Sequence, residues 1–218
     1  MNEMKGVLIL FGTIVATLAV IFIVPTLFTP AEKDFDQLHL ENYEQPPGEN
    51  NYIYNGFSFL KLPDPYTNVE FWYTQYEYRG NLYDIPLRFG PREVEGIQKQ
   101  IIEPTPLANY STMYITIDPA DIEVERRYLA LAVSEFSQKL AEVKQYPIVA
   151  ACTINETFPC SSRPIITCDY EEEVVVYFKD EGEAGITVNK NCITITGEEE
   201  ELVKAAYRGI YELLGIMK

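Results

Sequence analysis

Hydrophobic and polar positions divide the chain into one long apolar run followed by short alternating and helical patterns. The run covers residues 6–28 and contains no charged side chain. At about 1.5 Å per residue, a helix of this length spans roughly 34 Å, which is enough to cross a hydrocarbon core of about 30 Å. The pattern therefore predicts a transmembrane helix at residues 6–28, after a cytoplasmic stub at residues 1–5.

Two other interpretations of the apolar run stay open. A secretory signal peptide has an apolar core of about 7–15 residues and a small-residue cleavage site. Here the core is longer, and the nearest candidate, Thr29-Pro30-Ala31, has a proline inside the triplet. Lys5-Gly6 resembles a prepilin processing site, although the glutamate usual near the start of a mature pilin helix is missing. The uncleaved anchor is the leading prediction, and a pilin-like filament subunit is an alternative.

The domain that follows the run is predicted to lie outside the membrane. Only five residues, including Lys5, precede the run, and a short positive stub ordinarily stays inside. Four cysteines suit an oxidising compartment. A formal net charge of −16 argues against binding nucleic acid or an anionic membrane surface. We expect a single-pass protein of the cell membrane with an extracytoplasmic C-terminal domain.

Residues 29–51 are predicted to be a flexible tether. They carry several charges and Pro46-Pro47-Gly48, and they show no apolar period that could bury surface. The tether contains His39, the only histidine of the chain. The extracytoplasmic domain is predicted to comprise residues 52–218, a length that can form a real core.

The first section of this domain, residues 52–110, is predicted to be rich in strands. Residues 52–62 alternate in their second half, and residues 69–78 are dense in aromatic and β-branched side chains. Arg79-Gly80-Asn81 predicts a hairpin turn into a strand at residues 82–89. A short helix is expected over residues 91–95, where a proline stands first.

The second section, residues 111–218, is predicted to alternate strands with helices. A strand at residues 113–117 precedes a helix start in which Asp118 is the cap and Pro119 the first helical residue. The apolar residues that recur at helical spacing after this start are Leu129, Ala132, Val133, Phe136, Leu140 and Val143. The predicted strands that follow cover residues 148–153, 165–168, 174–178 and 186–196, the last with a turn near residues 189–191.

Two features of this section are more specific. Val174-Val175-Val176 is apolar at every position, as a central strand covered on both faces would be. Thr196 and Glu199 have the spacing of a capping box before a second helix, and Gly215 is placed to end that helix. Together the patterns predict an α+β fold, with an N-terminal transmembrane helix followed by a mixed β-sheet domain with two main packed helices.

The cysteines are predicted to form structural disulfides. Their spacings contain no C-x-x-C pair, and the domain has no histidine to complete a zinc site, so we expect no metal. Four cysteines allow three connectivities. We favour Cys152–Cys160, which closes a short loop, and Cys168–Cys192, which joins neighbouring strands. Chain-entropy arithmetic assigns these loops roughly 2.6 and 3.5 kcal/mol.

No segment matches a catalytic or cofactor motif. Serine and cysteine hydrolases need a base beside the nucleophile, and His39 lies in the predicted tether. The acids at residues 171–173 and 198–201 are interpreted as solvated turn and cap residues, and Asp118 is explained by its capping role. The chain also lacks a glycine-rich phosphate loop, so we expect no cofactor and no enzyme. A carboxylate-dependent enzyme acting on glycans is the alternative.

Surface chemistry is predicted from the aromatic residues and from two sequons. Tyr and Trp are favoured at interfaces, and strand alternation exposes some members of an aromatic-rich strand, although core packing with cross-strand pairs is the favoured explanation for most of them. The candidates for an interaction surface are Phe71, Trp72, Tyr73, Tyr76 and Tyr78. The candidates for N-glycosylation are Asn109 and Asn155, each in an Asn-x-Ser/Thr triplet.

Three motifs together carry a resemblance to a known group of proteins. They are Asn55-Gly56-Phe57-x-Phe59, Cys168 with Cys192-Ile193-x-Ile195-x-Gly197, and the closing helix to Leu214-Gly215-Ile216. The combination resembles small membrane-anchored surface proteins of archaea, over the larger part of the chain. The resemblance implies an extracytoplasmic domain on a membrane anchor and carries over no catalytic residues. We expect a binding or assembly module, such as an accessory subunit of a cell-envelope complex, with a protein partner or a second copy.

Overall fold

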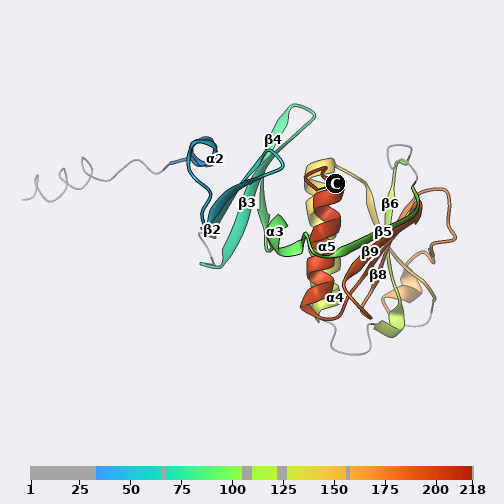
Figure 1. Ribbon diagram of the computed structural model, residues 1–218. Coiled ribbons are helices and arrows are strands. Elements are labelled where there is room, and N and C mark those ends of the chain that lie inside the picture. The colour runs from blue at the N-terminus through green and yellow to red at the C-terminus, as the bar shows by residue number, and fades with distance from the viewer. Residues whose placement is uncertain (1–32, 65–66, 105–109, 122–126, 156–157, 218) are drawn as a thin grey trace, which may run out of the picture. The chain divides into compact units, whose positions relative to one another are not determined.

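The computed structural model describes residues 33–64, 67–104, 110–121, 127–155 and 158–217 (Figure 1). The predicted transmembrane helix at residues 6–28 lies outside these ranges. Among the helices within them, none has both the length and the hydrophobicity needed to cross a bilayer. The chain divides into two compact units, Met1–Leu38 and His39–Lys218. Both β-sheets belong to the second unit, whose fold is α+β, as predicted.

A four-stranded antiparallel sheet forms the first part of this unit, with strand order β1-β2-β3-β4. Its strands are β1 (Asn51–Tyr54), β2 (Phe57–Pro63), β3 (Glu70–Tyr78) and β4 (Asn81–Leu87). The sequence analysis predicted one strand at residues 52–62, but the chain turns back at Asn55 and Gly56, with φ of 48° and 87°. An Asn-Gly pair is the preferred sequence of such a two-residue hairpin turn. The predicted turn after β3 is confirmed, with positive φ at Arg79 and Gly80.

A six-stranded mixed sheet forms the second part, with strand order β5-β9-β10-β8-β6-β7. Its strands are β5 (Gln98–Pro104), β6 (Met113–Ile117), β7 (Ile148–Cys152), β8 (Val174–Lys179), β9 (Gly185–Lys190) and β10 (Cys192–Thr196). Only β9 and β10 pair antiparallel, while the other neighbours are parallel. The three valines that open β8 are fully buried, which confirms β8 as a central strand.

Two strand predictions in this sheet need correction. Strand β5 was not predicted, and although it lies in the section at residues 52–110, it pairs with β9 of the later section. The strand predicted at residues 165–168 is reduced to a single bridge between Ile165 and Cys152. Neither segment has a clear alternation of apolar and polar positions, so hydrophobic period was a weak guide in both.

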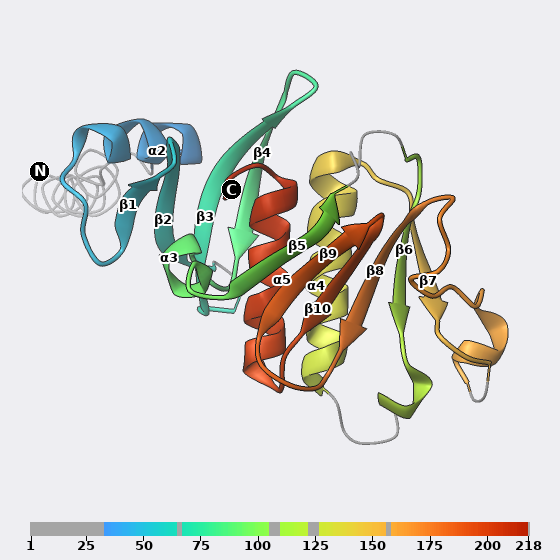
Figure 2. The same ribbon diagram turned by 45° about the vertical axis from the view of Figure 1, so that its right-hand side comes forward.

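Helices α4 (Arg127–Lys144) and α5 (Glu200–Leu213) lie side by side against the six-stranded sheet (Figure 2). Shorter elements are α3 (Pro91–Val94), which confirms the helix predicted at 91–95, and the 3₁₀ turns η2 (Pro119–Asp121) and η3 (Cys160–Ser162). Phe136 of α4 meets Phe178 of β8 edge to face, with ring centroids 5.4 Å apart, and Tyr211 of α5 meets Phe59 of β2 at 6.0 Å. One core therefore joins both sheets to the two helices.

The helix ends follow the predictions in part. Asp118 Oδ1 accepts the Ala120 N–H at 2.9 Å and so caps η2, whereas the described part of α4 begins only at Arg127. Gly215 has a φ of 74° and its N–H donates to Glu212 O, which confirms the end of α5. The capping box is wrong, because the Thr196 hydroxyl donates to Glu183 O at 2.9 Å instead of to the helix.

Part of the predicted tether is a helix, α2 (Phe35–Glu44). Its side chains His39 and Asn42 are only 2% exposed. His39 Nδ1 lies 2.7 Å from Ser58 Oγ. Asn42 Nδ2 lies 2.8 Å from the same oxygen and 3.1 Å from Phe59 O. These two polar side chains attach the end of α2 to β2, which a search for apolar periods could not reveal.

Both predicted disulfides, Cys152–Cys160 and Cys168–Cys192, are present. The second joins the segment before β8 to the first residue of β10. Two disulfides are compatible with an oxidising, extracytoplasmic environment.

Candidate functional site

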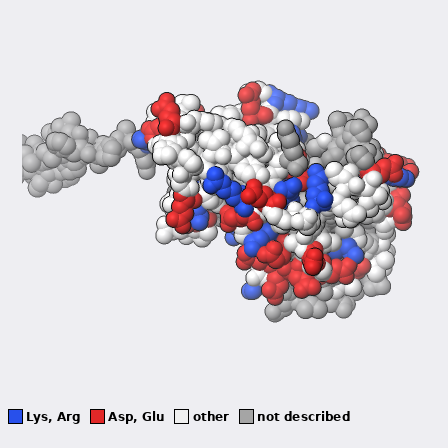
Figure 3. Space-filling model, in the orientation of Figure 1, with Lys and Arg blue, Asp and Glu red and all other residues white. Residues whose placement is uncertain are grey.

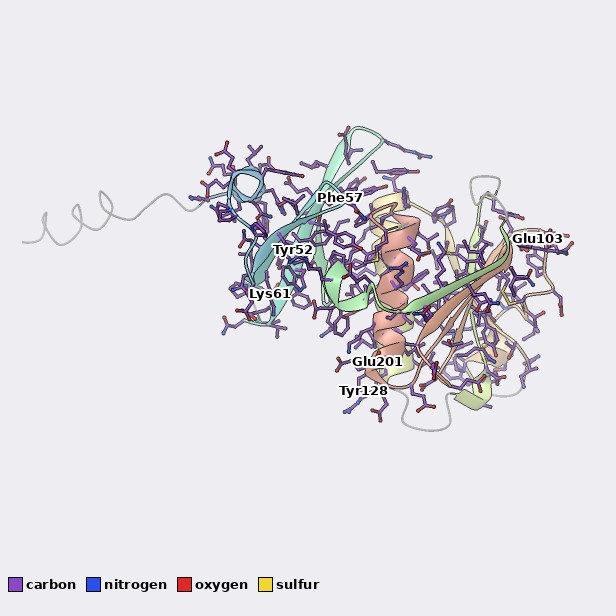
Figure 4. The ribbon with its side chains drawn as sticks, in the orientation of Figure 1. Tyr52, Phe57, Lys61, Glu103, Tyr128 and Glu201 are labelled. Carbon is purple, nitrogen blue, oxygen red and sulfur yellow. A yellow bond between two sulfur atoms is a disulfide. The ribbon has the colours of Figure 1, made fainter. Side chains whose placement is uncertain are left out.

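The predicted aromatic interaction surface is not supported at its centre. Trp72 and Tyr73 are 6% and 7% exposed, so their assignment to an exposed surface was wrong. Neighbouring strand residues point to opposite faces, and the burial of both shows that β3 is covered on both faces at this point. Trp72 Nε1 donates to Glu93 Oε2 at 2.8 Å, which satisfies the indole N–H. Tyr52 lies beside Trp72, toward α3 (Figure 4).

The other members of the aromatic group, Phe71, Tyr76 and Tyr78, are half-buried. Lys144 Nζ, at the end of α4, donates to Tyr76 Oη at 2.7 Å and lies 5.0 Å from the centroids of the Tyr76 and Tyr78 rings. These contacts attach the β3–β4 hairpin to α4. The aromatic residues therefore have packing roles that the composition alone could not separate from recognition.

The two edges of the six-stranded sheet differ in how they are covered. At the β7 edge, Cys152 N–H donates to Pro164 O at 3.1 Å and Ile166 N–H donates to Cys152 O at 2.9 Å. The Cys152–Cys160 disulfide holds the same segment beside the strand. The chain itself therefore covers this edge at its Cys152 end.

At the opposite edge, β5 pairs with β9 on one side, and no other described strand pairs with its outer side. Ile101 and Ile102 are 52% and 60% exposed, and the register shifts between Ile101 and Glu103. Glu103 lies near the C-terminal end of β5 (Figure 4). Lys99 Nζ is 2.5 Å from Glu212 Oε2 of α5, which holds the start of the strand in place. The middle of β5 thus presents apolar side chains and an unpaired backbone edge.

A cavity of about 220 Å³ opens between the four-stranded sheet and α4. The residues that line it are Asp64, Phe71, Pro86, Arg88, Glu135, Gln138, Lys139 and Tyr207. They come from the ends of β2 and β4, from β3 and from both long helices. Four of the eight carry a formal charge, so the cavity is polar on one wall and apolar at Phe71 and Pro86.

Arg88 and Glu135 form a two-pronged ion pair at this cavity. Arg88 Nη2 lies 2.7 Å and Nε lies 3.1 Å from Glu135 Oε1. This hydrogen bonding raises the pKa of the Arg88 guanidinium. The Arg88 backbone N–H donates to Tyr207 Oη at 3.1 Å, and burial raises the pKa of that phenol. The pair joins the chain after β4 to α4 and α5.

Lys139 lies on the same wall and is 7% exposed. Burial lowers the pKa of its amine, while Glu142 and Glu135 act in the opposite direction. Sequence reasoning missed Arg88, Glu135 and Lys139. Each is an ordinary charged residue in its local pattern, and only the packing of α4 on the β3–β4 hairpin brings them together.

Two of the acids that the sequence singled out, Glu171 and Glu173, have local structural partners. Glu171 Oε1 accepts from Lys190 Nζ at 2.7 Å, and Glu173 accepts from the Ser111 and Thr112 N–H groups. Acidic side chains gather at the start of α5 (Figure 3), where residues 198–201 are exposed. Within the described ranges, no three His, Cys, Asp or Glu side chains are grouped so that they could hold a metal ion. Of the sequons, Asn155 is exposed and Asn109 lies outside the described residues.

Comparisons of the chain with protein families, with curated proteins and with solved structures found no match.

Proposed function

We propose that the chain is a membrane-tethered extracytoplasmic binding module, and that strand β5 receives an extended segment of a protein partner in the cell envelope. The observation that carries this proposal is the contrast between the two sheet edges. The chain covers the Cys152 end of its β7 edge with a disulfide-held segment, whereas β5 leaves two isoleucines more than half exposed.

An open edge strand supports binding because its free N–H and C=O groups can pair with an added strand. Backbone pairing provides affinity, and side chains on alternate positions provide specificity. Proteins usually protect such edges with charges or irregularities. Strand β5 has a bulge and ends at Pro104, yet its apolar middle remains accessible. The tethered topology rests on the apolar run at residues 6–28 and on the two disulfides.

Site-specific photocrosslinking in native membranes tests the proposal. A photoreactive amino acid at position 102, on β5, should crosslink to a contiguous extended segment of one partner, identified by mass spectrometry. The matched control is the same amino acid at position 154, because Ile154 is an exposed isoleucine, 39% accessible, that follows β7 at the end which the chain covers. Crosslinks of equal yield at both positions, or none at position 102, would contradict the proposal. A crosslink to another copy of this chain would show that β5 mediates self-association and does not bind a different protein.

A carboxylate-dependent glycosidase is not favoured by the cavity. Such an enzyme needs two carboxyl groups facing each other across the substrate. Glu135 is committed to Arg88 by two short hydrogen bonds, and Asp64 Oδ1 accepts from the Thr67 N–H and hydroxyl at 2.8 Å. Both carboxylates therefore already hold parts of the fold in position.

A further inference from the structure

The side chain of Lys139 is mostly buried beside the cavity, and no described carboxylate lies within hydrogen-bond distance of its amine. Among the described residues, the only carboxylate oxygen within reach of Lys139 Nζ is Glu142 Oε2, at 4.0 Å. That separation exceeds hydrogen-bond distance. An ammonium group at the end of a mostly buried side chain is only partly solvated, so a counterion in hydrogen-bond contact would stabilise it. A negatively charged group from outside the chain can take that place.

The other charged pair at the cavity does not supply that group. Glu135 already accepts three hydrogen bonds from Arg88, two at Oε1 and one at Oε2, so both oxygens are directed to the guanidinium. Glu142, the distant neighbour of Lys139, also accepts from Gln138 Nε2 at 2.9 Å through its other oxygen. Lys139 is thus the cation of this wall whose charge is least compensated by direct contact.

The shape and lining of the cavity limit what the group can be. Its volume of about 220 Å³ is below the roughly 300–1,000 Å³ of sites that hold drug-sized ligands. Phe71 and Pro86 provide an apolar wall, and the Phe71 ring already lies 5.7 Å from the Arg88 guanidinium carbon. A ligand that fits has one anionic end and a small apolar body.

We propose that this cavity binds a small organic carboxylate, whose carboxylate pairs with Lys139 Nζ and whose ring or short apolar chain lies against Phe71 and Pro86. The ligand carboxylate provides the hydrogen-bonding counterion that Glu142 is too distant to provide. This site is separate from β5 and does not depend on the function proposed for that strand.

Calorimetric titration of the full chain, purified in detergent, tests the proposal with phenylacetate as the probe. The wild type should bind one equivalent. Lys139→Met keeps an unbranched side chain that is only one atom shorter and removes the charge, so the fold should persist. Losing a charge-assisted hydrogen bond should weaken binding by roughly tenfold to a hundredfold. The matched control is Lys144→Met on the same helix, because Lys144 bonds Tyr76 outside the cavity; it should bind as the wild type does.

A chemical measurement locates the site independently of affinity. Acetic anhydride should acetylate Lys139 more slowly in the presence of phenylacetate, as measured by peptide mass spectrometry, while exposed Lys190 should react equally in both conditions. Inorganic phosphate that protects Lys139 equally well would overturn the carboxylate assignment. Absence of protection, or unchanged binding by Lys139→Met, would overturn the site.

Discussion

The four-stranded sheet contains no cysteine, whereas all four cysteines lie in or beside the six-stranded sheet. The six-stranded sheet is built around β8, whose three valines are fully buried, and one disulfide holds a segment at the end of β7 while the other links the segment before β8 to β10. The four-stranded sheet is held by buried polar side chains and close aromatic packing, as at His39, Asn42 and Trp72. The two sheets are therefore stabilised in different ways. Disulfides at the six-stranded sheet reduce the conformational entropy of the unfolded chain, whereas the polar and aromatic contacts of the four-stranded sheet depend on native geometry.

Removal of the Cys168–Cys192 disulfide should cause the largest loss. Replacing both residues by alanine should lower the free energy of unfolding by about 3.5 kcal/mol, which is the contribution of loop-closure entropy expected for a loop of this length. Urea denaturation of the full chain in detergent, compared with the wild type, measures the change. Ser134→Ala, at an exposed position on α4, is the control. A loss no larger than that of the control would show that the six-stranded sheet does not rely on this covalent link.

Gly90→Ala should test the close packing of the four-stranded sheet. A Cβ atom at Gly90 would lie 2.4 Å from Tyr52 Oη and 3.0 Å from the Trp72 indole, both in the buried interior. Overpacking of this kind costs about 1–3 kcal/mol, which thermal or urea unfolding detects.

Gly96→Ala is the matched control for this change, because a Cβ atom there meets nothing within 4 Å. It should leave the stability nearly unchanged. Equal effects of the two substitutions would mean that the aromatic packing around Gly90 tolerates expansion, and the contrast between the sheets would lose its main support.

Alkaline pH should act on the tyrosines of α5 that pack against the four-stranded layer. Burial raises the pKa of both Tyr207 and Tyr211, and Tyr211 Oη donates to Phe89 O at 2.5 Å. Because each folded-state pKa exceeds the unfolded value of about 10, the folded state binds more protons at high pH. The stabilisation is complete below about pH 10 and falls as the pH rises further.

Tyr207→Phe should reduce this alkaline loss by up to about 1.4 kcal/mol per pH unit. The substitution also removes the acceptor of the Arg88 N–H, so the variant should start about 1 kcal/mol less stable near neutral pH. Urea unfolding at a series of pH values between neutral and about pH 11 measures both effects. Tyr43→Phe, at a tyrosine that is 55% exposed, is the control. Parallel pH profiles for wild type and Tyr207→Phe would refute the linkage.

The parts of the fold that the sequence predicted are those in which one local signal dominates. The valine run of β8, the Gly215 helix end and the disulfide pairs each depend on a residue type whose chemistry leaves few choices. The Asn55-Gly56 turn carried an equally strong signal, and the prediction of one continuous strand overlooked it. The Asn-Gly pair alone is enough to predict that hairpin.

The parts that the sequence could not predict depend on distant contacts. His39 and Asn42 look like tether residues until Ser58 lies beside them. Strand β5 has too few apolar positions to be recognised from the sequence. Its place in the sheet is set by pairing with β9, which lies far along the chain, so that Gln98 pairs with Gly185. The cavity likewise exists only after α4 packs beside the β3–β4 hairpin. Candidate sites built from tertiary packing leave little trace in a single sequence.

The smallest predicted effect concerns Glu173, which gives the six-stranded sheet a polar contact of the kind that dominates the other sheet. Its carboxylate accepts from the Ser111 hydroxyl at 2.7 Å and from the Ser111 and Thr112 N–H groups at 2.9 Å. These bonds, which hold the start of β6 beside β8, lower the pKa of the Glu173 carboxyl, with the Ser111 hydroxyl as the largest cause. Since the folded-state pKa lies below the unfolded one, the stabilisation is present above about pH 4.3 and is lost as the pH falls through the folded value.

Glu173→Gln should therefore lower stability at neutral pH by less than about 1 kcal/mol, because contacts near the surface are weakened by solvent. The difference from the wild type should vanish in acid, where the wild-type carboxyl is protonated. Unfolding curves recorded at neutral pH and at about pH 3 reveal both features, with Glu103→Gln at an exposed position as the control. A loss as large as that of Gly90→Ala would show that the six-stranded sheet depends on polar contacts as much as the four-stranded sheet does, and the proposed division between covalent and polar stabilisation would have to be abandoned.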